Sequence, residues 1–520
     1  MDPYDQFFYE SIPFPETHPR HLASLGRLFG LETADPERCR LLELGCASGG
    51  DLIASAWFSP DSELLGIDLS HGQIARGREL IRRLDLKNIE LRQGDILDLD
   101  QRLGRFDYIV AHGVYSWVPA PVREHILVLS RQLLRPGGLL YLSFNTLPGW
   151  RMRGMLRDIL LYACRDADDA STRLERAHAA LTRLERSLQQ LDALSARYLR
   201  EEIAQIRKAP PSYLLHEYLA GENNAFLFSE FLGDAGRAGL RYLCDAELAG
   251  LFPSTFGEAV EDALADIGDD MEVEQWLDFV GARNFRRALL CRDDARVEDA
   301  LSLDIFAGFA FSSALVPPPK VDLRRSKPIS FREPDGTPVA VRHPLTRALL
   351  LEMHARQPDL VPLETLLSGA SERLRRVGAG QPAGDREGCL MELFSLFCHR
   401  SVSASPRGRS FGQTICHRPA ISSLARGELA AGQRHLSTAQ HGSLDLDPFS
   451  RLLLLHLDGG NDLEALCDRL CAEIRGGVLA PPGGVGTGGR LRGRVAEECR
   501  GLIGLFARCG ILDSGASAKY

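Results

Sequence analysis

The sequence is poor in lysine. Of its 61 basic residues only five are lysines, and they are scattered along the chain: Lys87, Lys208, Lys320, Lys327 and Lys519. One interpretation is an enzyme that modifies lysine and avoids modifying itself. The other is a GC-rich genome, whose codons favour arginine, alanine, glycine and leucine together. Because alanine, leucine and glycine are abundant here too, we favour the second interpretation.

The chain also lacks any Cys-x-x-Cys pair among its 12 cysteines. Zinc sites and disulfide frameworks depend on such spacings, so the sequence predicts no metal site and no disulfide scaffold. Cys467 and Cys471 share one helix face, but no histidine pair stands nearby, and burial is the expected role of both. The net charge of −9 argues against a general nucleic-acid binder.

Long apolar runs are missing as well. None approaches the roughly 20 residues that cross a bilayer, so no membrane insertion is predicted. The first residues, Met-Asp-Pro-Tyr-Asp, lack the basic and apolar regions of a signal peptide. The expected location is therefore the cytoplasm.

The most informative segment runs from Leu41 to Gly50 and reads Leu-Leu-Glu-Leu-Gly-Cys-Ala-Ser-Gly-Gly. Together with Leu64–Asp68 it has the pattern of a buried strand, a glycine turn, a helix and a second strand that ends in an acid. This is the layout that binds an adenosine cofactor. Ala47 stands where a dinucleotide site needs a glycine beside the pyrophosphate, and the Gly-Lys-Ser/Thr of a P-loop is absent. A cofactor without phosphates, S-adenosylmethionine (SAM), fits what remains.

Further segments follow in the order typical of one enzyme family: Glu43–Gly49, Asp68, Gly94–Ile96, Phe106–Val110 and Arg135–Gly138. In these segments the chain resembles a class I SAM-dependent methyltransferase. Other segments resemble the bacterial subfamily with a methyltransferase regulatory domain, which includes outer-membrane-protein lysine methyltransferases: Tyr4-Asp5, Pro13–Pro19, His112–Pro119 and Asn145–Trp150. The resemblance is strong over residues 1–150, fair over 205–295 and thin beyond.

The resemblance implies a cofactor site beyond the carboxyl ends of the strands. Gly45 and Gly49 would let the backbone approach the methionine portion, and Glu43 would hold its amino group. Asp68 would accept both ribose hydroxyls, and Asp95 would receive the adenine amino group. A tight turn is the alternative role for the glycines, and capping is the alternative for Asp95. The full set expected to bind the cofactor is Glu43, Gly45, Ala47, Gly49, Asp68, Leu69, Asp95, Ile96 and His112.

The methyl acceptor is expected after the fourth and fifth strands, where related enzymes line the acceptor pocket. Methyl transfer needs a neutral nucleophile aligned with the sulfonium. Tyr115 and Trp117 are predicted to form an aromatic wall that desolvates an amine and tolerates the cationic product. His112 could relay a proton, although a structural hydrogen bond is the stronger expectation for it. Asn145 and Trp150 are expected to shape the same side, with loop packing as an equal alternative.

Residues 13–19 precede the first strand and contain Thr17 and His18. Such a segment folds either as a lid over the cofactor cleft or as a rigid amino-terminal wrap. Tyr4 and Tyr9 share this ambiguity.

The expected fold is α/β, with a doubly wound, mostly parallel sheet, a following helical domain, and a small winged-helix-like carboxyl-terminal region. The predicted strands are 40–44, 63–67, 89–92, 106–111 and 139–144. The predicted domains are a SAM-binding core at 1–150, a helical insert with the regulatory domain at 151–316, and a substrate or dimer platform at 317–520.

Later patterns refine this division. From Leu174 to Tyr198 apolar residues recur in alternating steps of three and four, which predicts a helix that packs within the chain, with a dimer contact left open. Pro317–Pro319 marks a linker. Pro334–Thr337 signals a hairpin, which places a winged-helix-like module at 320–400. The last predicted elements are helices within 444–475 and 491–513 around a flexible glycine-rich loop at 476–490.

The predicted function is methyl transfer from SAM to lysine side chains of a protein that the later domains hold. The alternatives are a small-molecule N- or O-methyltransferase, whose later domains would cover the pocket, and a SAM-binding regulatory protein without turnover. A homodimer is left open. On this reasoning, removal of residues 321–520 should leave SAM binding nearly intact and weaken binding of a protein substrate.

Overall fold

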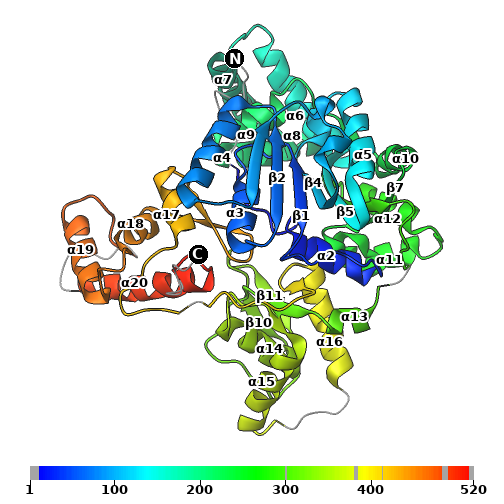
Figure 1. Cartoon of the computed structure of the whole chain (residues 1–520). Coiled ribbons are helices and arrows are strands. Elements are labelled where there is room, and N and C mark those ends of the chain that lie inside the picture. Colours follow the sequence, from blue (N-terminus) through cyan, green and yellow to red (C-terminus); the bar gives the residue numbers. More distant parts are fainter. Residues whose placement is uncertain (1–10, 299–300, 380–384, 413, 483–489, 514–520) are drawn as a thin grey trace.

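A central mixed sheet organises the molecule (Figure 1). The computed structural model describes residues 11–298, 301–379, 385–412, 414–482 and 490–513. Within these residues, eight strands pair in the order β3-β2-β1-β4-β5-β8-β7, with β6 beside β5. The first five run parallel, and β8 is antiparallel to both β5 and β7. The strands are β1 (Arg40–Leu44), β2 (Glu63–Asp68), β3 (Ile89–Gln93), β4 (Phe106–Ala111), β5 (Leu134–Thr146), β6 (Ala225–Phe226), β7 (Leu240–Asp245) and β8 (Phe285–Arg292).

Helices cover both faces of this sheet, and neighbouring residues on its inner strands enter opposite cores. Leu41 of β1 joins the core shared with α2, α3 and α4, whereas Leu42 joins the core shared with α5 and α10. Burial on both faces explains why the strands read as nearly continuous apolar runs. The covering helices are α2 (Pro19–Leu28), α3 (Gly50–Phe58), α4 (His71–Leu84), α5 (Ala120–Leu133) and α10 (Phe228–Arg237).

The five predicted strands are confirmed, and the sheet continues beyond residue 150, where the SAM-binding core was predicted to end. β7 and β8 come from the segment assigned to the helical domain, and β8 pairs with β5 from Leu139↔Cys291 to Asn145↔Phe285. The sheet therefore needs the chain as far as Arg292.

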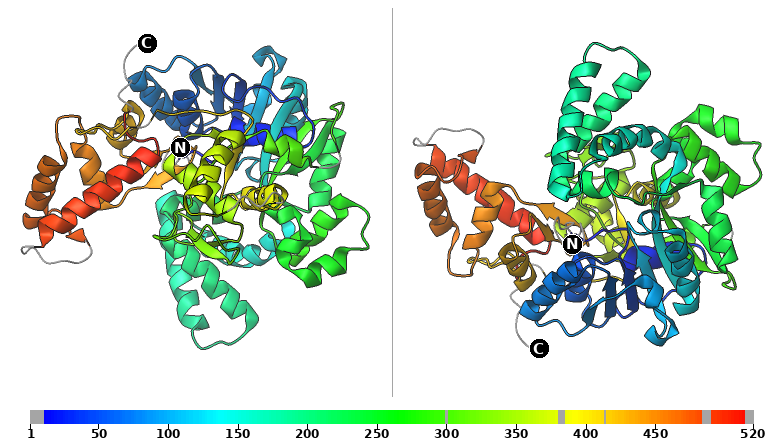
Figure 2. Two further views of the ribbon diagram at one scale, coloured as in Figure 1. Left: turned by 90° about the horizontal axis from the view of Figure 1, so that it is seen from below. Right: turned by 90° about the horizontal axis from the view of Figure 1, so that it is seen from above.

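A helical hairpin projects from the sheet domain (Figure 2). The predicted single helix is two helices, α7 (Ala170–Leu188) and α8 (Leu194–Lys208), which pack beside α6 (Leu147–Cys164) and the π-helix η4 (Leu214–Tyr218). Leu174 and Leu181 lie in this small core, whereas Leu191 falls in the break between helices and is 52% exposed. Packing within the chain is confirmed, and the dimer contact stays a prediction.

The next segment completes the sheet domain's core and is not a separate unit beginning at residue 317. β9 (Ala310–Ser312) pairs with β12 (Val361–Pro362) and β13 (Ser403–Ser405), so strands from both sides of that predicted boundary form one sheet. The predicted hairpin is confirmed as β10 (Ile329–Arg332) and β11 (Pro338–Val341), with Gly336 at φ +91° in its turn. The helices of this segment are α14 (Pro344–Ala355), α15 (Leu363–Arg376) and α16 (Asp385–Cys398).

The last segment forms a lobe with its own core (Figures 1 and 2). It comprises α17 (Ser423–Ala430), the hairpin β14 (His435–Ser437) and β15 (Ser443–Asp445), α18 (Pro448–His456), α19 (Leu463–Arg475) and α20 (Leu491–Arg508). The helices predicted around the glycine-rich loop are confirmed, and residues 483–489 of that loop lie outside the described residues.

The remaining α-helices of the described residues are α9 (Pro211–Tyr213), α11 (Glu258–Leu264), α12 (Asp270–Val280) and α13 (Leu303–Ala307). Across the described part of the chain, no helix is long and apolar enough to cross a membrane.

Candidate active site

The glycine loop after β1 has the conformation that its sequence demands. Gly45 and Gly49 have φ values of +76° and +73°, and a Cβ on Gly45 would lie 2.3 Å from Val114 Cγ2. Ala47 also adopts a positive φ of +48°, and its N–H donates to Asp68 Oδ2 at 2.8 Å. The loop is thereby fixed against the carboxylate that ends β2.

Glu43, near the end of β1, carries a buried carboxylate oxygen. The residue is 6% exposed, and its Oε2 has no hydrogen-bond partner among the described residues. Burial, and then the charges of Asp51 and Asp68, raise the pKa of Glu43 well above its usual range. A buried acceptor that makes no hydrogen bond destabilises the protein, because its lost contact with water is not replaced. Oε2 of Glu43 is therefore suited to accept a hydrogen bond from a ligand, such as the amino group of the methionine portion.

Asp68 is engaged through both of its carboxylate oxygens at the end of β2. Oδ2 accepts the Ala47 N–H, and Oδ1 accepts the Ser70 N–H at 2.8 Å. Ribose binding by Asp68 stays a prediction. The next side chain, Leu69, is 61% exposed at the same strand end.

Asp95 makes the capping contact weighed as its alternative role. Its Oδ1 accepts the Leu97 N–H at 2.9 Å at the start of a short 3₁₀ turn. Ile96 packs against the core beneath α5. Adenine binding by these two residues stays a prediction.

The amino-terminal segment is anchored on the first turn of α3. The Gly50 N–H donates to Ser11 Oγ at 2.8 Å. The Phe14 N–H and the Thr17 hydroxyl donate to Asp51 Oδ1 at 2.9 and 2.8 Å. These contacts favour the wrap interpretation over a free lid, while Tyr4 and Tyr9 lie outside the described residues.

The same segment is tied to the rest of the chain by ion pairs and a cap. Glu16 pairs with Arg287 at 3.1 Å and with Arg400 at 2.8 Å. His18 caps α2, since its Nδ1 accepts the Arg20 N–H at 3.0 Å. Residues 11–18 are therefore a structural part of the site's wall.

His112 sits behind this segment as a neutral hydrogen-bonding group. Its Nδ1 lies 3.0 Å from the Tyr141 hydroxyl, and its ring centroid lies 4.3 Å from that of Phe14. Burial lowers the pKa of His112 to about 4. An imidazole with that pKa is a poor acceptor for an amine's proton, which favours the structural role.

Tyr115 is part of the aromatic core, and its predicted place in the acceptor wall is corrected. The side chain is 1% exposed, and its ring packs 5.4 Å from Phe226 and 5.7 Å from Phe231. These phenylalanines lie more than 100 residues further along the chain, so the sequence near Tyr115 does not reveal that they enclose it.

Trp117 and Trp150 meet where β4 and β5 end. Their ring centroids are 6.1 Å apart at an interplanar angle of 79°, and the Arg153 guanidinium lies 5.7 Å from the Trp150 ring. Trp150 also contacts Tyr218 of the π-helix, with centroids 6.3 Å apart. Such π-helical turns occur frequently at functional sites.

Glu217 lies in this π-helix, directly before Tyr218 in the sequence, and was not predicted. Burial, opposed by the charge of Arg153, raises the pKa of Glu217 to about 7. A carboxyl group that titrates near neutral pH is suited to proton transfer. The sequence carries no signal for it, because the shift comes from packing against distant residues.

Asn145 joins the two strand ends to the π-helix region. Its backbone N–H donates to Ser116 Oγ at 2.8 Å, and its Nδ2 donates to Asn223 Oδ1 at 3.1 Å. The Asn224 N–H donates to the Ser116 carbonyl at 2.7 Å. Asn145 thus holds the two strand ends and the chain after the π-helix together, which agrees with the packing alternative.

Comparisons with known proteins identify relatives along nearly the whole chain. An uncharacterized protein of Rickettsia prowazekii is 29% identical and covers 92% of this chain and 87% of that protein. A second one is 37% identical over 46% of this chain and 96% of its own length. The structure of PKMT2 from Rickettsia typhi in complex with AdoHcy is 27% identical with a TM-score of 0.84, covering 97% of this chain and 99% of that one.

Three families match successive parts of the chain: a methyltransferase domain at residues 36–157, a predicted methyltransferase regulatory domain at 210–292, and a PKMT C-terminal winged helix domain at 417–508. The last match corrects the predicted winged-helix position at 320–400. Both segments combine a hairpin with helices, so the sequence pattern did not separate them. The chain therefore belongs to the SAM-dependent methyltransferases that carry this regulatory domain and the PKMT winged-helix domain.

Proposed function

We propose that this methyltransferase transfers the methyl group of SAM to lysine side chains of proteins. The observation that carries the proposal is the Trp117–Trp150 pair, to which Glu217 is linked through Arg153. The Arg153 guanidinium lies 5.7 Å from the Trp150 ring, and its charge acts on Glu217, whose pKa burial raises to about 7. Aromatic rings and a titratable carboxyl group are what an amine acceptor requires. The likeness to PKMT2 from Rickettsia typhi over 97% of the chain supports the same acceptor class.

The reaction needs the lysine amine in its neutral form. Bound SAM supplies an electrophilic methyl group on a sulfonium, and the amine nitrogen forms the new C–N bond as the C–S bond breaks. Before that step Glu217, which is partly ionised near neutral pH, accepts the ammonium proton. The Trp117 and Trp150 rings exclude water from the amine, which favours its neutral form, and their faces tolerate the cationic product.

The cofactor would be held from the opposite side by the β1 and β2 strand ends. Glu43 would accept its amino group, Asp68 its ribose hydroxyls, and the Gly45–Gly49 backbone would lie against its methionine portion. Leu69 and Ile96 would contact the adenine, with Asp95 at its amino group. A cytoplasmic location and a homodimer also remain predictions.

The test is incorporation of a labelled methyl group into host lysate by the full-length protein. We expect label in protein, and we expect its loss when the lysate lysines are first acetylated. Trp117→Ala should abolish most incorporation, whereas Trp276→Ala, which removes a 46% exposed tryptophan of α12, should not. Label confined to extractable small molecules would favour the small-molecule alternative, and no label anywhere would favour a regulatory protein without turnover.

A further inference from the structure

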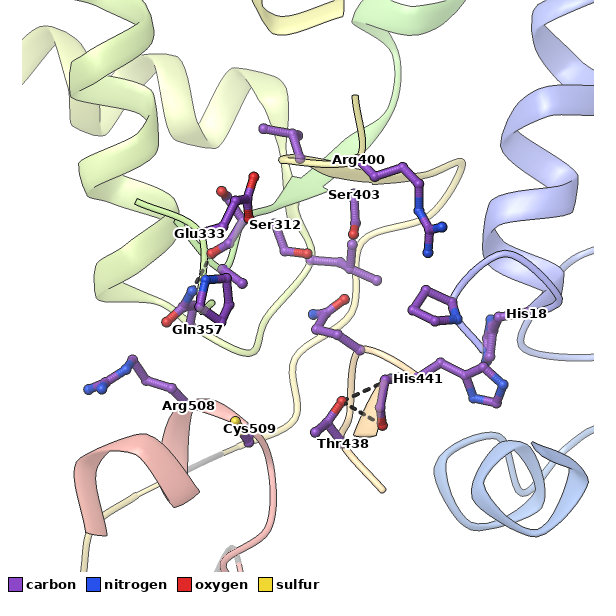
Figure 3. Close-up of a pocket in the computed structure, with 18 of the residues that line it drawn as sticks. His18, Ser312, Glu333, Gln357, Arg400, Ser403, Thr438, His441, Arg508 and Cys509 are labelled. Carbon is purple, nitrogen blue, oxygen red and sulfur yellow. Dashed lines mark hydrogen bonds between the residues drawn. The ribbon is translucent and has the colours of Figure 1, made fainter. Parts of the chain in front are cut away.

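His441 reaches the cofactor loop from the carboxyl-terminal region. It lies in the turn between β14 and β15 and is 2% exposed. Its Nε2 lies 2.9 Å from Oδ1 of Asp51, a residue 390 positions earlier in the chain. Figure 3 shows His441 beside His18 at one wall of a cavity of about 530 Å³, with Arg508 and Cys509 across it. The two imidazole rings meet edge to face with centroids 4.4 Å apart.

The backbone at His441 is held in a conformation that non-glycine residues rarely adopt. Its φ is +60°, and the turn is fixed by the His441 N–H, which donates to the Thr438 carbonyl at 2.9 Å. The Gly442 N–H also donates to Thr438 Oγ1 at 3.0 Å. Such conformations persist where the surroundings require them, and here the turn aims the imidazole at Asp51.

Asp51 is the point where three donors from two distant parts of the chain converge. Its Oδ1 accepts the Phe14 N–H, the Thr17 hydroxyl and the His441 Nε2–H. Burial would raise the pKa of Asp51, but His441 and the other donors outweigh it and lower that pKa. The carboxylate is therefore ionised although it is only 4% exposed.

Asp51 also lies at the cofactor site itself. It directly follows Gly49 and Gly50 at the start of α3, and its charge is one cause of the raised pKa of Glu43. Loss of a donor to a buried carboxylate leaves part of its desolvation cost uncompensated. The carboxylate would then shift or take up a proton, and the segment at residues 11–18 would lose its anchor on the loop.

We propose that His441 is a positioning residue of the cofactor site: by fixing Asp51 it holds residues 11–18 against the glycine loop, so that the carboxyl-terminal region sets the affinity for SAM. In this role the side chain acts through Asp51 and not by contact with the cofactor or the acceptor. This role does not depend on lysine being the acceptor.

The test compares His441 variants of the full-length protein by calorimetric titration with SAM in the absence of acceptor. His441→Ala should weaken SAM binding at least about tenfold, or about 1.4 kcal/mol. His441→Gln should stay within about threefold of the wild type, because its amide N–H can still donate to Asp51. His435→Ala is the matched control, since His435 lies in the same hairpin and pairs with the exposed Asp445, and it should bind SAM normally.

Measurements of kcat and of the KM for SAM distinguish a positioning role of His441 from general damage to the fold. At saturating SAM, His441→Ala should keep its kcat within about twofold while its KM for SAM rises. Wild-type SAM affinity in His441→Ala would overturn the proposal, and so would equal weakening by Ala and Gln. If His441→Ala does not fold, Thr17→Val provides the test instead. This substitution removes another donor to Asp51 Oδ1 with little change in the shape of the side chain. Several-fold weaker SAM binding by that variant supports the proposal, and unchanged binding overturns it.

Discussion

Glu217→Gln should change activity and stability in opposite directions. The variant keeps the size of the side chain but removes its ability to ionise. If Glu217 accepts the lysine proton, kcat at pH 8 should fall roughly 10²–10⁴-fold, the usual contribution of general base catalysis. The wild-type rate should rise with pH through about 7, where burial places the pKa of Glu217, and this rise should vanish in the variant.

The stability effect follows from the same pKa. The ordinary value for a glutamate is 4.5, and burial raises the pKa of Glu217 to about 7 in the folded protein. Between these values the folded state binds a proton that the unfolded state does not, so the free energy of unfolding falls as pH rises. The loss is at most about 3 kcal/mol above pH 7. Glutamine does not ionise and so avoids this loss. The free energy of unfolding of the variant should therefore match that of the wild type near pH 4 and exceed it at pH 8.

Thermal midpoints at pH 5 and pH 8, together with the pH dependence of kcat, measure both effects. Glu428 provides the control, because burial also raises its pKa to about 7 while it accepts the Ser437 N–H in the winged-helix lobe. Glu428→Gln should alter the pH dependence of stability and leave kcat at saturating SAM unchanged. A Glu217→Gln variant that keeps the wild-type pH–rate profile would refute the reasoning.

Four further predictions concern residues or segments named above. Asp68→Ala should abolish measurable SAM binding in calorimetry, since each charge-assisted hydrogen bond to ribose contributes roughly 1.5–3 kcal/mol. Trp117→Ala should lower kcat far more than SAM affinity, and the reverse pattern would move Trp117 to the cofactor side. Tyr115→Phe should keep its turnover, whereas Tyr115→Ala should cost about 3–5 kcal/mol in denaturant unfolding. A 1–320 chain should lose SAM binding, against the expectation from the sequence, because it lacks His441 and leaves β9 without its partner strands.

The sequence predicts the parallel half of the sheet and the cofactor loop because both are local. β1, β2, β4 and the second half of β5 contain short apolar runs, and β3 alternates apolar and polar residues. Gly45, Gly49 and Asp68 stand at fixed spacings along one segment. β7 and β8 were not predicted because β8 is placed by antiparallel pairing with β5, more than 100 residues earlier, and β7 by pairing with β8. The winged-helix lobe was misplaced for a related reason, since two segments carry the same hairpin-and-helix pattern.

The surroundings of Trp117 were less predictable than the glycine loop. Trp117 and Trp150 pack against each other, but the neighbouring Tyr115 turns into the core, where Phe226 and Phe231 enclose it. An acceptor site at Trp117, Trp150 and Asn145 stays a prediction. The contact of His441 with Asp51 spans 390 positions and has no periodic or motif signal. The raised pKa of Glu217 and the burial of Tyr115 also depend on contacts between distant parts of the chain, so the sequence alone does not predict them.

The central claim is that this enzyme methylates protein lysine with SAM. The most direct measurement is amino-acid analysis of protein labelled by the full-length enzyme with methyl-labelled SAM and host lysate. Our account predicts that the label is recovered as Nε-methylated lysine and that it disappears with Glu217→Gln. Recovery of the label in another amino acid, or only in small molecules outside protein, would contradict it.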